Sequence, residues 1–128
     1  MHYHTHSPAA ASAAAATLPL TRPLDDRIFI NQRNRMIRVL LRDIQYIEAQ
    51  RAYCLIVTEH RTYTLSISLG KLAEQLPPQR LIRIHRSYLV NPAAVSEISD
   101  GCVVVGDRCL PVSKANRSLM RAQIRLIS

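Results

Sequence analysis

Apolar and polar positions alternate most clearly in the stretch 81–92, which has the sequence LIRIHRSYLVNP. Ile82 and Ile84 fall on one face of a predicted half-buried strand, and basic side chains fall on the other. The alternation breaks at Arg86, because a longer strand would place this guanidinium in the apolar row, where an unpaired charge is very costly. We therefore predict a turn at His85 and Arg86 that presents basic side chains on an exposed corner.

Short apolar runs bounded by polar turns recur from residue 27 onward and predict a mainly β domain. The predicted strands span residues 27–30, 36–40, 44–49, 53–58, 62–65, 82–85, 88–90, 102–105 and 110–112. Most neighbouring runs have no helix between them, so we expect antiparallel pairing. Pro111 favours an edge position for the last run, because proline has no N–H to donate to a second neighbour.

Two helices interrupt this β pattern. The first has one apolar stripe at i, i+3, i+4 and i+7, and prolines at 77 and 78 end it. This stripe consists of Leu69, Leu72, Ala73 and Leu76. The second is predicted from Lys114 onward, with Ser113 as its cap. Its expected buried side consists of Leu119, Met120, Ile124 and Ile127.

A row of cations is predicted on another face of this terminal helix. Its members are Lys114, Arg117, Arg121 and Arg125, at i, i+3, i+7 and i+11. Such a face is often only solvated, and the alternative is phosphate contact by its first turn. The second interpretation makes Lys114 and Arg117 candidate DNA-binding residues.

The 128-residue chain divides into a short tail, residues 1–24, and one folded domain, residues 25–128. The tail is rich in Ala, Ser and Pro and lacks the charged start and strongly apolar centre of a signal peptide. We predict that it is disordered. Its alternating His2, His4 and His6 could loosely hold a transition metal, but a flexible polar tail is the favoured interpretation.

The net charge of +8, from 17 basic and 9 acidic residues, favours an anionic partner. Only Lys71 and Lys114 of the basic residues are lysines. Arginine suits phosphate and guanine better than lysine, so this bias favours nucleic acid. An arginine-rich codon usage is the alternative explanation.

The three cysteines are Cys54, Cys102 and Cys109, and no CxxC spacing occurs among them. An odd number without that spacing argues against a disulfide scaffold or a zinc site. If residues 106 and 107 form a two-residue turn, Val104 lies opposite Cys109, and a bridge from Cys109 to Cys102 is not expected. We predict three reduced thiols in a cytoplasmic protein. No apolar run approaches the ~18–20 residues of a membrane span.

Motifs of enzymes are not found. Ser87 lacks a nucleophile elbow, and neither HExxH nor a glycine-rich phosphate loop occurs in a chain with three glycines. The acidic residues are scattered, with no pair at a spacing typical of acid–base catalysis. We therefore expect no enzyme, no cofactor and no metal site.

Several of these blocks resemble the LytTR DNA-binding domain of bacterial transcription regulators. They are residues 43–49 with Tyr53, residues 68–76, RIHRSYLVN at 83–91 and LPVSK at 110–114. They follow the family order over about residues 27–127; RIHRSYLVN is highly specific, and YIEA at 46–49 is moderately so. The resemblance implies an elongated fold of about ten short antiparallel strands in small packed sheets, with short helices and with loops that enter successive major grooves of DNA.

The resemblance also implies three places of DNA contact. The first is the loop after residue 49, with Gln50, Arg51 and Tyr53. The second is the corner with His85 and Arg86, where the residue after the histidine reads a base. The third is Lys114 with Asn116, at the start of the terminal helix. Lys114 stands where the family often has arginine, which implies a point-charge contact.

These observations predict a sequence-specific binder of double-stranded DNA, a transcription regulator that acts as two copies on repeated half-sites. Family members usually carry a receiver domain or membrane helices ahead of this module. Here only the tail precedes it, so we expect an output domain that takes its input from a sensor kinase or another signalling protein, or control through its own abundance.

Two other interpretations remain. The first is an adaptor whose basic face docks an acidic signalling protein. The second, an RNA-binding β module, is weaker because the chain has one Phe, no Trp and no aromatic stacking pair on a strand. For Arg86 itself, the alternative to base contact is an ion pair with Glu48 or another carboxylate.

Overall fold

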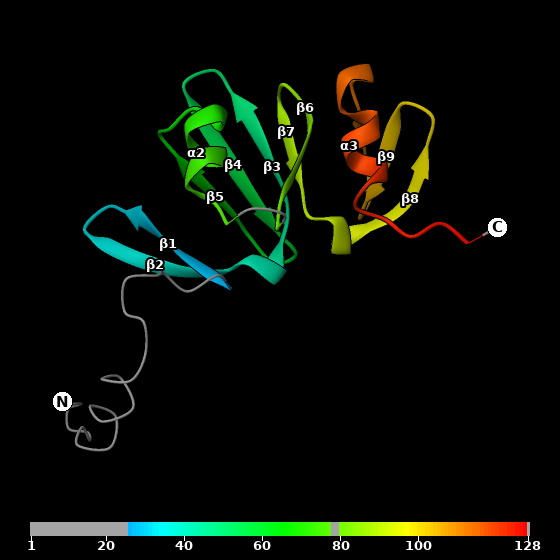
Figure 1. The fold of residues 1–128 in the computed structure, drawn as a ribbon. Coiled ribbons are helices and arrows are strands. Elements are labelled where there is room, and N and C mark those ends of the chain that lie inside the picture. Colours follow the sequence, from blue (N-terminus) through cyan, green and yellow to red (C-terminus); the bar gives the residue numbers. More distant parts are fainter. Residues whose placement is uncertain (1–25, 78–79, 128) are drawn as a thin grey trace, which may run out of the picture.

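The computed structural model describes residues 26–77 and 80–127. Ten strands, three 3-10 helices and two short α-helices occur within these ranges (Figure 1). The strands are β1 (Arg27–Gln32), β2 (Arg35–Leu40), β3 (Ile44–Gln50), β4 (Tyr53–Thr58), β5 (Thr62–Leu65), β6 (Ile82–His85), β7 (Tyr88–Val90), β8 (Val95–Ser99), β9 (Cys102–Val105) and β10 (Arg108–Pro111). The helices are η1 (Leu41–Asp43), α2 (Leu69–Gln75), η2 (Pro92–Ala94), η3 (Lys114–Asn116) and α3 (Arg117–Arg121).

The strands form three small sheets, and every strand pair is antiparallel. β1 and β2 form a hairpin, five strands form a central sheet in the order β5-β4-β3-β7-β6, and the last three form a sheet in the order β10-β9-β8. Figure 1 shows the hairpin, the central sheet and the C-terminal sheet following one another along the molecule. The predicted mainly β class, antiparallel pairing and edge position of Pro111 are confirmed.

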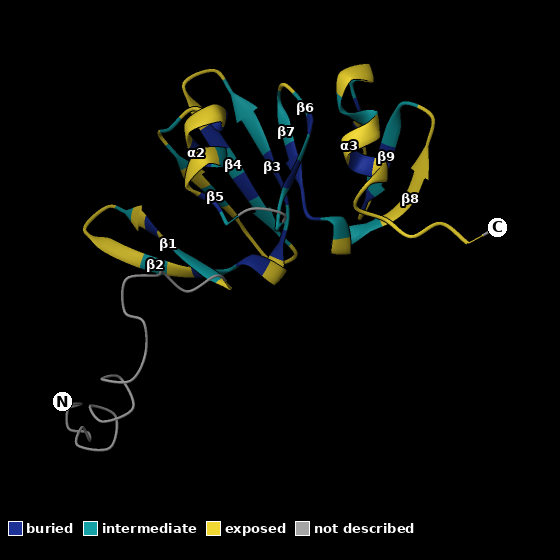
Figure 2. Cartoon of the chain, in the orientation of Figure 1, coloured by how far each residue is buried: buried dark blue, intermediate teal, exposed yellow. Residues whose placement is uncertain are grey.

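The central sheet is buried on both faces because each face covers a separate core. The first core lies among the sheet, the hairpin and α2, and includes Ile47 and Leu72. The second lies between the sheet and the C-terminal strands, and includes Tyr46 and Leu110. Neighbouring residues of β3 enter opposite cores, as the two-residue period of a strand requires. Figure 2 shows this buried interior running through β3 and β7.

The predicted first helix and the predicted corner are both confirmed. Leu69, Leu72 and Leu76 are buried, and the Ser68 hydroxyl caps α2 by accepting a hydrogen bond from the Lys71 backbone N–H at 3.2 Å. β6 ends at His85 and a two-residue turn follows. The physical reason given for that turn holds, because Arg86 is exposed where a longer strand would have buried it.

Asn91 joins the end of β7 to the start of β3. It is the one amide or charged side chain among the buried residues that the structure describes. Its amide donates to the Ile44 carbonyl at 2.9 Å and accepts from the Ala93 backbone N–H at 3.0 Å. These bonds satisfy a buried polar group and fix where β7 meets β3, which gives a structural reason for the asparagine that ends the RIHRSYLVN block.

The prediction for the terminal helix is partly wrong. The α-helix spans only Arg117–Arg121, and residues 122–127 are not helical. Of the expected buried side, Met120 is buried, whereas Leu119, Ile124 and Ile127 are exposed. The Ser113 side chain makes no cap hydrogen bond to a backbone N–H and instead accepts one from the Asn116 amide at 2.6 Å. Since five residues make little more than one turn, the four cations do not share one helical face.

The expectation of three reduced thiols is also wrong. Cys102 and Cys109 form a disulfide across the β9–β10 hairpin, and only Cys54 is free. The predicted register is correct, since Cys109 pairs with Val104. Sheet twist, however, shortens one diagonal of a hairpin, and the two Cα atoms are 6.0 Å apart, within the usual range for a disulfide.

One strand was not predicted. β8 (Val95–Ser99) pairs with β9, yet all its residues after Val95 are exposed. Its sequence therefore lacks the row of buried apolar positions from which the other strands were predicted. The predicted tail, residues 1–24, lies outside the described residues. No helix in the described part of the chain is long and apolar enough to cross a membrane.

Candidate nucleic-acid interface

Three segments far apart in the sequence meet at one edge of the molecule, which we call the loop edge. It consists of the β3–β4 turn, the β6–β7 turn and the start of η3, all at the top of Figure 1. Two backbone hydrogen bonds join them: Ala49 N–H donates to Ser87 O at 2.8 Å, and Ser113 N–H donates to Ile84 O at 2.8 Å. The three places inferred from the sequence are therefore neighbours in the fold.

The β3–β4 turn presents Arg51 in a strained backbone conformation. Its φ of 50° lies in the left-handed region, which is uncommon for a residue other than glycine. The Arg51 side chain is exposed, and Tyr53 is 38% exposed at the start of the next strand. Gln50 differs from these two, because its half-buried amide donates to Glu48 Oε2 at 3.2 Å. Of the three residues predicted here to contact DNA, Arg51 and Tyr53 face solvent.

The Arg83 side chain fixes the conformation of the β6–β7 turn. Its Nε donates to the His85 carbonyl at 2.8 Å, and its Nη2 donates to the Arg86 carbonyl, also at 2.8 Å. One planar guanidinium thus fixes two successive peptide units of the turn. The structure shows no ion pair of Arg86 with a carboxylate in the described ranges, so the alternative of a structural Arg86–Glu48 pair is not supported.

His85 is oriented by the same turn. The Ser87 backbone N–H donates to its Nδ1 at 3.1 Å, and its ring lies 5.9 Å from the Tyr88 ring. A nitrogen that accepts a hydrogen bond carries no proton, so in the neutral imidazole the proton is on Nε2. His85 is therefore a donor through Nε2, which suits an acceptor such as a phosphate oxygen or a guanine.

The start of η3 contributes Lys114, which is exposed. Asn116 is half-buried, and its amide nitrogen donates one hydrogen bond to Ser113 Oγ, which leaves its second N–H and its oxygen for further contacts. Arg117 turns to the neighbouring β8–β9 turn, where its Nη1 lies 3.2 Å from Asp100 Oδ1. Its charge is thus shared with a carboxylate, unlike that of Lys114.

A polar brace behind the loop edge connects the central and C-terminal sheets. Arg108, from β10, donates to the Tyr46 hydroxyl at 2.9 Å and to the Tyr88 hydroxyl at 3.5 Å. Its guanidinium also lies 3.9 Å from Glu48 Oε1. Burial raises the pKa of Tyr46 above its ordinary value, so this phenol stays protonated at neutral pH. Glu48 in turn holds Gln50, so the brace extends to the first turn.

The electrostatics of the loop edge are positive because its nearest carboxylates are engaged. Glu48 pairs with Arg108, and Asp100 pairs with Arg117. The exposed cations Arg51, Arg86 and Lys114 are not in any ion pair within the part of the chain that the structure describes. A row of exposed cations beside neutralised carboxylates is suited to an anion such as the DNA backbone.

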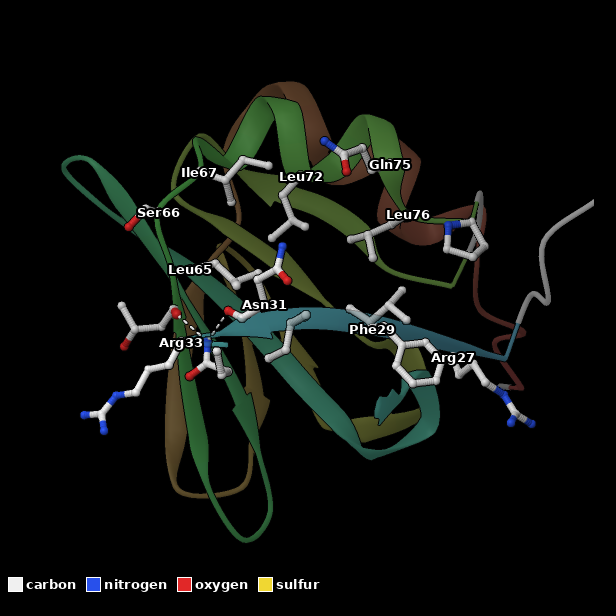
Figure 3. Close-up of a pocket in the computed structure, with 15 residues that line it drawn as sticks. Arg27, Phe29, Asn31, Arg33, Leu65, Ser66, Ile67, Leu72, Gln75 and Leu76 are labelled. Carbon is white, nitrogen blue, oxygen red and sulfur yellow. Dashed lines mark hydrogen bonds between the residues drawn. The ribbon is translucent and has the colours of Figure 1, made fainter. Parts of the chain in front are cut away.

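An open cavity lies away from the loop edge, between β1 and α2. It has a volume of about 1070 Å³, and Figure 3 shows Leu65, Ile67, Leu72 and Leu76 on its walls. Its lining includes no Asp, Glu, His or Cys. In the described ranges, no group of three His, Cys, Asp or Glu side chains could hold a metal ion. The cavity is therefore not a candidate for acid–base or metal chemistry.

Sequence reasoning found the exposed residues of the loop edge but missed Arg83 and Arg108. Arg83 was seen only as one of several basic residues, because nothing in an alternating strand shows that its guanidinium returns to the turn. Arg108 follows the Gly106–Asp107 turn, and its partners are up to 62 residues away in the sequence. The pairing of two separate sheets decides these contacts.

The small antiparallel β domain and the positively charged edge of three loops suit a DNA-binding domain. Comparison with known proteins supports the same class of domain. The family model described as LytTr DNA-binding domain matches residues 34–125. The chain therefore belongs to the LytTR family of DNA-binding domains. This family is a class of DNA-binding domains and not a class of enzymes.

Two curated relatives are transcription regulators. Transcriptional regulatory protein YpdB of Escherichia coli (strain K12) is 32% identical over 88 residues, which is 69% of this chain and 35% of that protein. The heme-containing CO-sensing transcriptional regulator RcoM 2 of Paraburkholderia xenovorans (strain LB400) is 27% identical over 121 residues, 89% of this chain and 45% of that protein. This chain thus spans less than half the length of either relative.

The fold has also been seen in a solved structure. The LytTr DNA-binding domain of a response regulator from Bacillus cereus superposes with a TM-score of 0.64, covering 77% of this chain and 95% of that one. The two sequences are 24% identical, so this likeness shows the fold.

Proposed function

We propose that this protein is a transcription regulator that binds double-stranded DNA in a sequence-specific manner through the loop edge. The observation that carries the proposal is the pair of backbone hydrogen bonds that join the three loops into one positively charged edge. In this proposal Arg86 and His85 contact bases, Arg51 and Tyr53 contact the duplex from the first turn, and Lys114 contacts a phosphate. Gln50, Asn116 and Arg117 have a secondary role in this proposed DNA contact, since their side chains already have protein partners.

The length of the loop edge bears on how many grooves one copy can enter. From β4 to β6 there are three interstrand steps of about 4.8 Å, or roughly 14 Å, and η3 extends the row beyond β6. This length is close to the ~12 Å width of one major groove, whereas successive major grooves on one face of a duplex lie about 34 Å apart. We therefore propose that the loops read successive major grooves when copies are bound to repeated half-sites. A single small module reads few base pairs, so we propose two copies on repeated half-sites.

The cellular setting of this activity is part of the proposal. A regulator of bacterial transcription acts in the cytoplasm, and an upstream sensor kinase or other signalling protein would supply its input. The alternative function, an adaptor that docks an acidic signalling partner through the same edge, predicts protein binding that a DNA duplex displaces and no preference among duplex sequences.

Selection from a pool of randomised duplexes, followed by sequencing, tests the proposal. The wild-type protein should enrich a repeated motif. Arg86→Ala should relax the preference at one base position of each half-site, because a bidentate arginine–guanine pair contributes about 1–3 kcal/mol of discrimination. Its affinity for random duplexes should fall far less, since the phosphate contacts remain.

Arg125→Ala is the matched control, because Arg125 lies beyond α3 and outside the loop edge. This variant should enrich the same motif as the wild type. Thermal melts of both variants show whether they are folded. A folded Arg86→Ala protein with an unchanged motif would exclude base contact by Arg86, and a wild type that enriches no motif would exclude sequence-specific binding.

A further inference from the structure

The β1–β2 hairpin and the segment that follows it carry an unusual set of exposed side chains. Residues 27–42 include five arginines, at 27, 33, 35, 38 and 42, and no Asp, Glu or Lys. Arg27 is paired with Asp26 at 2.8 Å, which leaves the other four without a carboxylate partner in the described part of the chain. This concentration of positive charge belongs to none of the three loops of the loop edge.

The same hairpin exposes two large apolar side chains. Phe29 is 60% exposed and Met36 is 72% exposed. Phe29 pairs with Arg38 and Met36 pairs with Asn31, so all four side chains lie on one face of the hairpin. The opposite face is buried in the first core through Ile30 and Val39. We call the exposed face, with Phe29, Met36 and Arg38, the outer hairpin face.

A basic cleft adjoins the outer hairpin face. It has a volume of about 520 Å³ and lies between β2, η1 and the β4–β5 turn. The cationic residues on its walls are Arg38, Arg42 and Arg61, with His60 beside them. Arg38 belongs to both the face and the cleft, so the two form a continuous surface. Asp43 and Glu59 also line the cleft and lower its net charge.

This surface lies at the opposite end of the central sheet from the loop edge. β3 begins after η1, beside the cleft, and ends at Gln50, beside the first turn. Its seven residues span roughly 20 Å at about 3.3 Å each. Figure 1 shows η1 at the lower end of the sheet and the β3–β4 turn at the upper end. A duplex on the loop edge would leave the cleft and the hairpin open to another molecule.

We propose that the outer hairpin face and the basic cleft form a docking site for an acidic segment of another protein that carries a large apolar side chain. Arginine, methionine and aromatic residues are enriched in protein interfaces, whereas lysine, aspartate and glutamate are depleted. Residues 27–42 have this composition. The arginines fit carboxylates, and Phe29 and Met36 supply apolar contact that the DNA backbone would not use. A transcription regulator bound to DNA would thereby hold a second protein on its far side.

Fluorescence anisotropy with a labelled synthetic peptide of alternating acidic and apolar residues tests this site. The full-length protein should bind the peptide, and a duplex of random sequence should not displace it. Arg38→Gln with Arg42→Gln should weaken peptide binding on the order of fivefold, because each exposed charge pair contributes only weakly to affinity. Phe29→Ser with Met36→Ser should weaken it to a similar degree, and neither double variant should change affinity for the selected DNA motif.

The control is Arg51→Gln with Arg86→Gln, which removes the same charge from the loop edge. This variant should bind the peptide like the wild type while losing DNA affinity, so the two sites fail independently. Three results would overturn the docking site: no peptide binding by the wild type, equal weakening in both arginine variants, or displacement of the peptide by the random duplex. A failure to select a DNA motif would bear on the proposed function alone.

Discussion

At the scale of residues, Arg83 orders the β6–β7 turn, because its guanidinium donates hydrogen bonds to the carbonyls of both His85 and Arg86. Arg83→Met removes both hydrogen bonds and frees the turn to sample other conformations. DNA affinity should then fall several-fold, because the turn must be ordered at the moment of binding, at a cost of roughly 1 kcal/mol. The enriched motif should stay the same, since in the proposed interface Arg86 can still contact its base. Affinity measurement and motif selection on the same variant check this.

Arg83→Lys distinguishes a positioning role from a direct phosphate contact. Lysine keeps the charge but lacks the planar fork that reaches two carbonyls at once. If Arg83 positions the turn, the lysine variant should bind DNA as weakly as Arg83→Met. Recovery of wild-type affinity by lysine would instead assign Arg83 to the DNA backbone.

For single residues, the exposure of a side chain was easier to predict from the sequence than its hydrogen-bond partners. The exposed position of Arg86 follows from broken alternation, because the burial of a charge is costly whatever the fold. The partners of Arg83, His85 and Arg108 depend on where carbonyls and hydroxyls of other segments lie. Those positions are set by the turn geometry and by the packing of two sheets, neither of which is encoded in local periodicity.

At the scale of elements, the sequence predicted the structure where one face is buried. β6 and α2 each have an apolar row that matches their period, and both were found. β8 was missed because nearly all its residues are exposed. Its hydrogen bonds to β9, and not the burial of an apolar face, keep this strand in place. The terminal helix was predicted too long because Ile124 and Ile127 match the helical period but are exposed in the structure.

The disulfide leads to a prediction about the β9–β10 hairpin. Cys102 and Cys109 are seven residues apart, and closing such a short loop in the unfolded chain contributes about 2 kcal/mol of stability. Reduction should therefore lower the melting temperature by roughly 10 °C for a domain of this size. Calorimetric melts with and without a reductant measure this shift.

The variant Cys102→Ser with Cys109→Ser should melt like the reduced wild type and should not respond to the reductant. Cys54 contributes no redox effect, because it is buried and its burial raises the pKa of its thiol. Alkylation of unfolded, unreduced protein should modify Cys54 alone. Modification of all three cysteines, with equal melts in both conditions, would show that the bridge does not form.

At the scale of the whole molecule, the described structure predicts that the first residues are not needed for folding. The buried residues of both cores lie between Ile30 and Met120. Residues 1–22 also have no apolar periodicity with which to bury a face. Deletion of 1–22 should leave a cooperative melt and nearly unchanged DNA affinity. Loss of cooperativity in the truncated protein would move the domain boundary into the tail.

The positive charge of the whole molecule leads to a quantitative prediction for DNA binding. Each phosphate that a cation neutralises lowers the logarithm of the affinity by about 0.9 per tenfold increase in salt, because condensed counterions are released. In the proposed interface Arg86 contacts a base, which leaves Arg51 and Lys114 as the exposed cations that neutralise phosphates. One copy should therefore give a slope of roughly −2 on a logarithmic plot, and two copies roughly twice that. Arg51→Gln should make the slope shallower by about one unit per copy, whereas Arg125→Ala should not change it. Binding to DNA that does not respond to salt would rule out phosphate contact and favour the adaptor interpretation, in which the loop edge serves a protein partner.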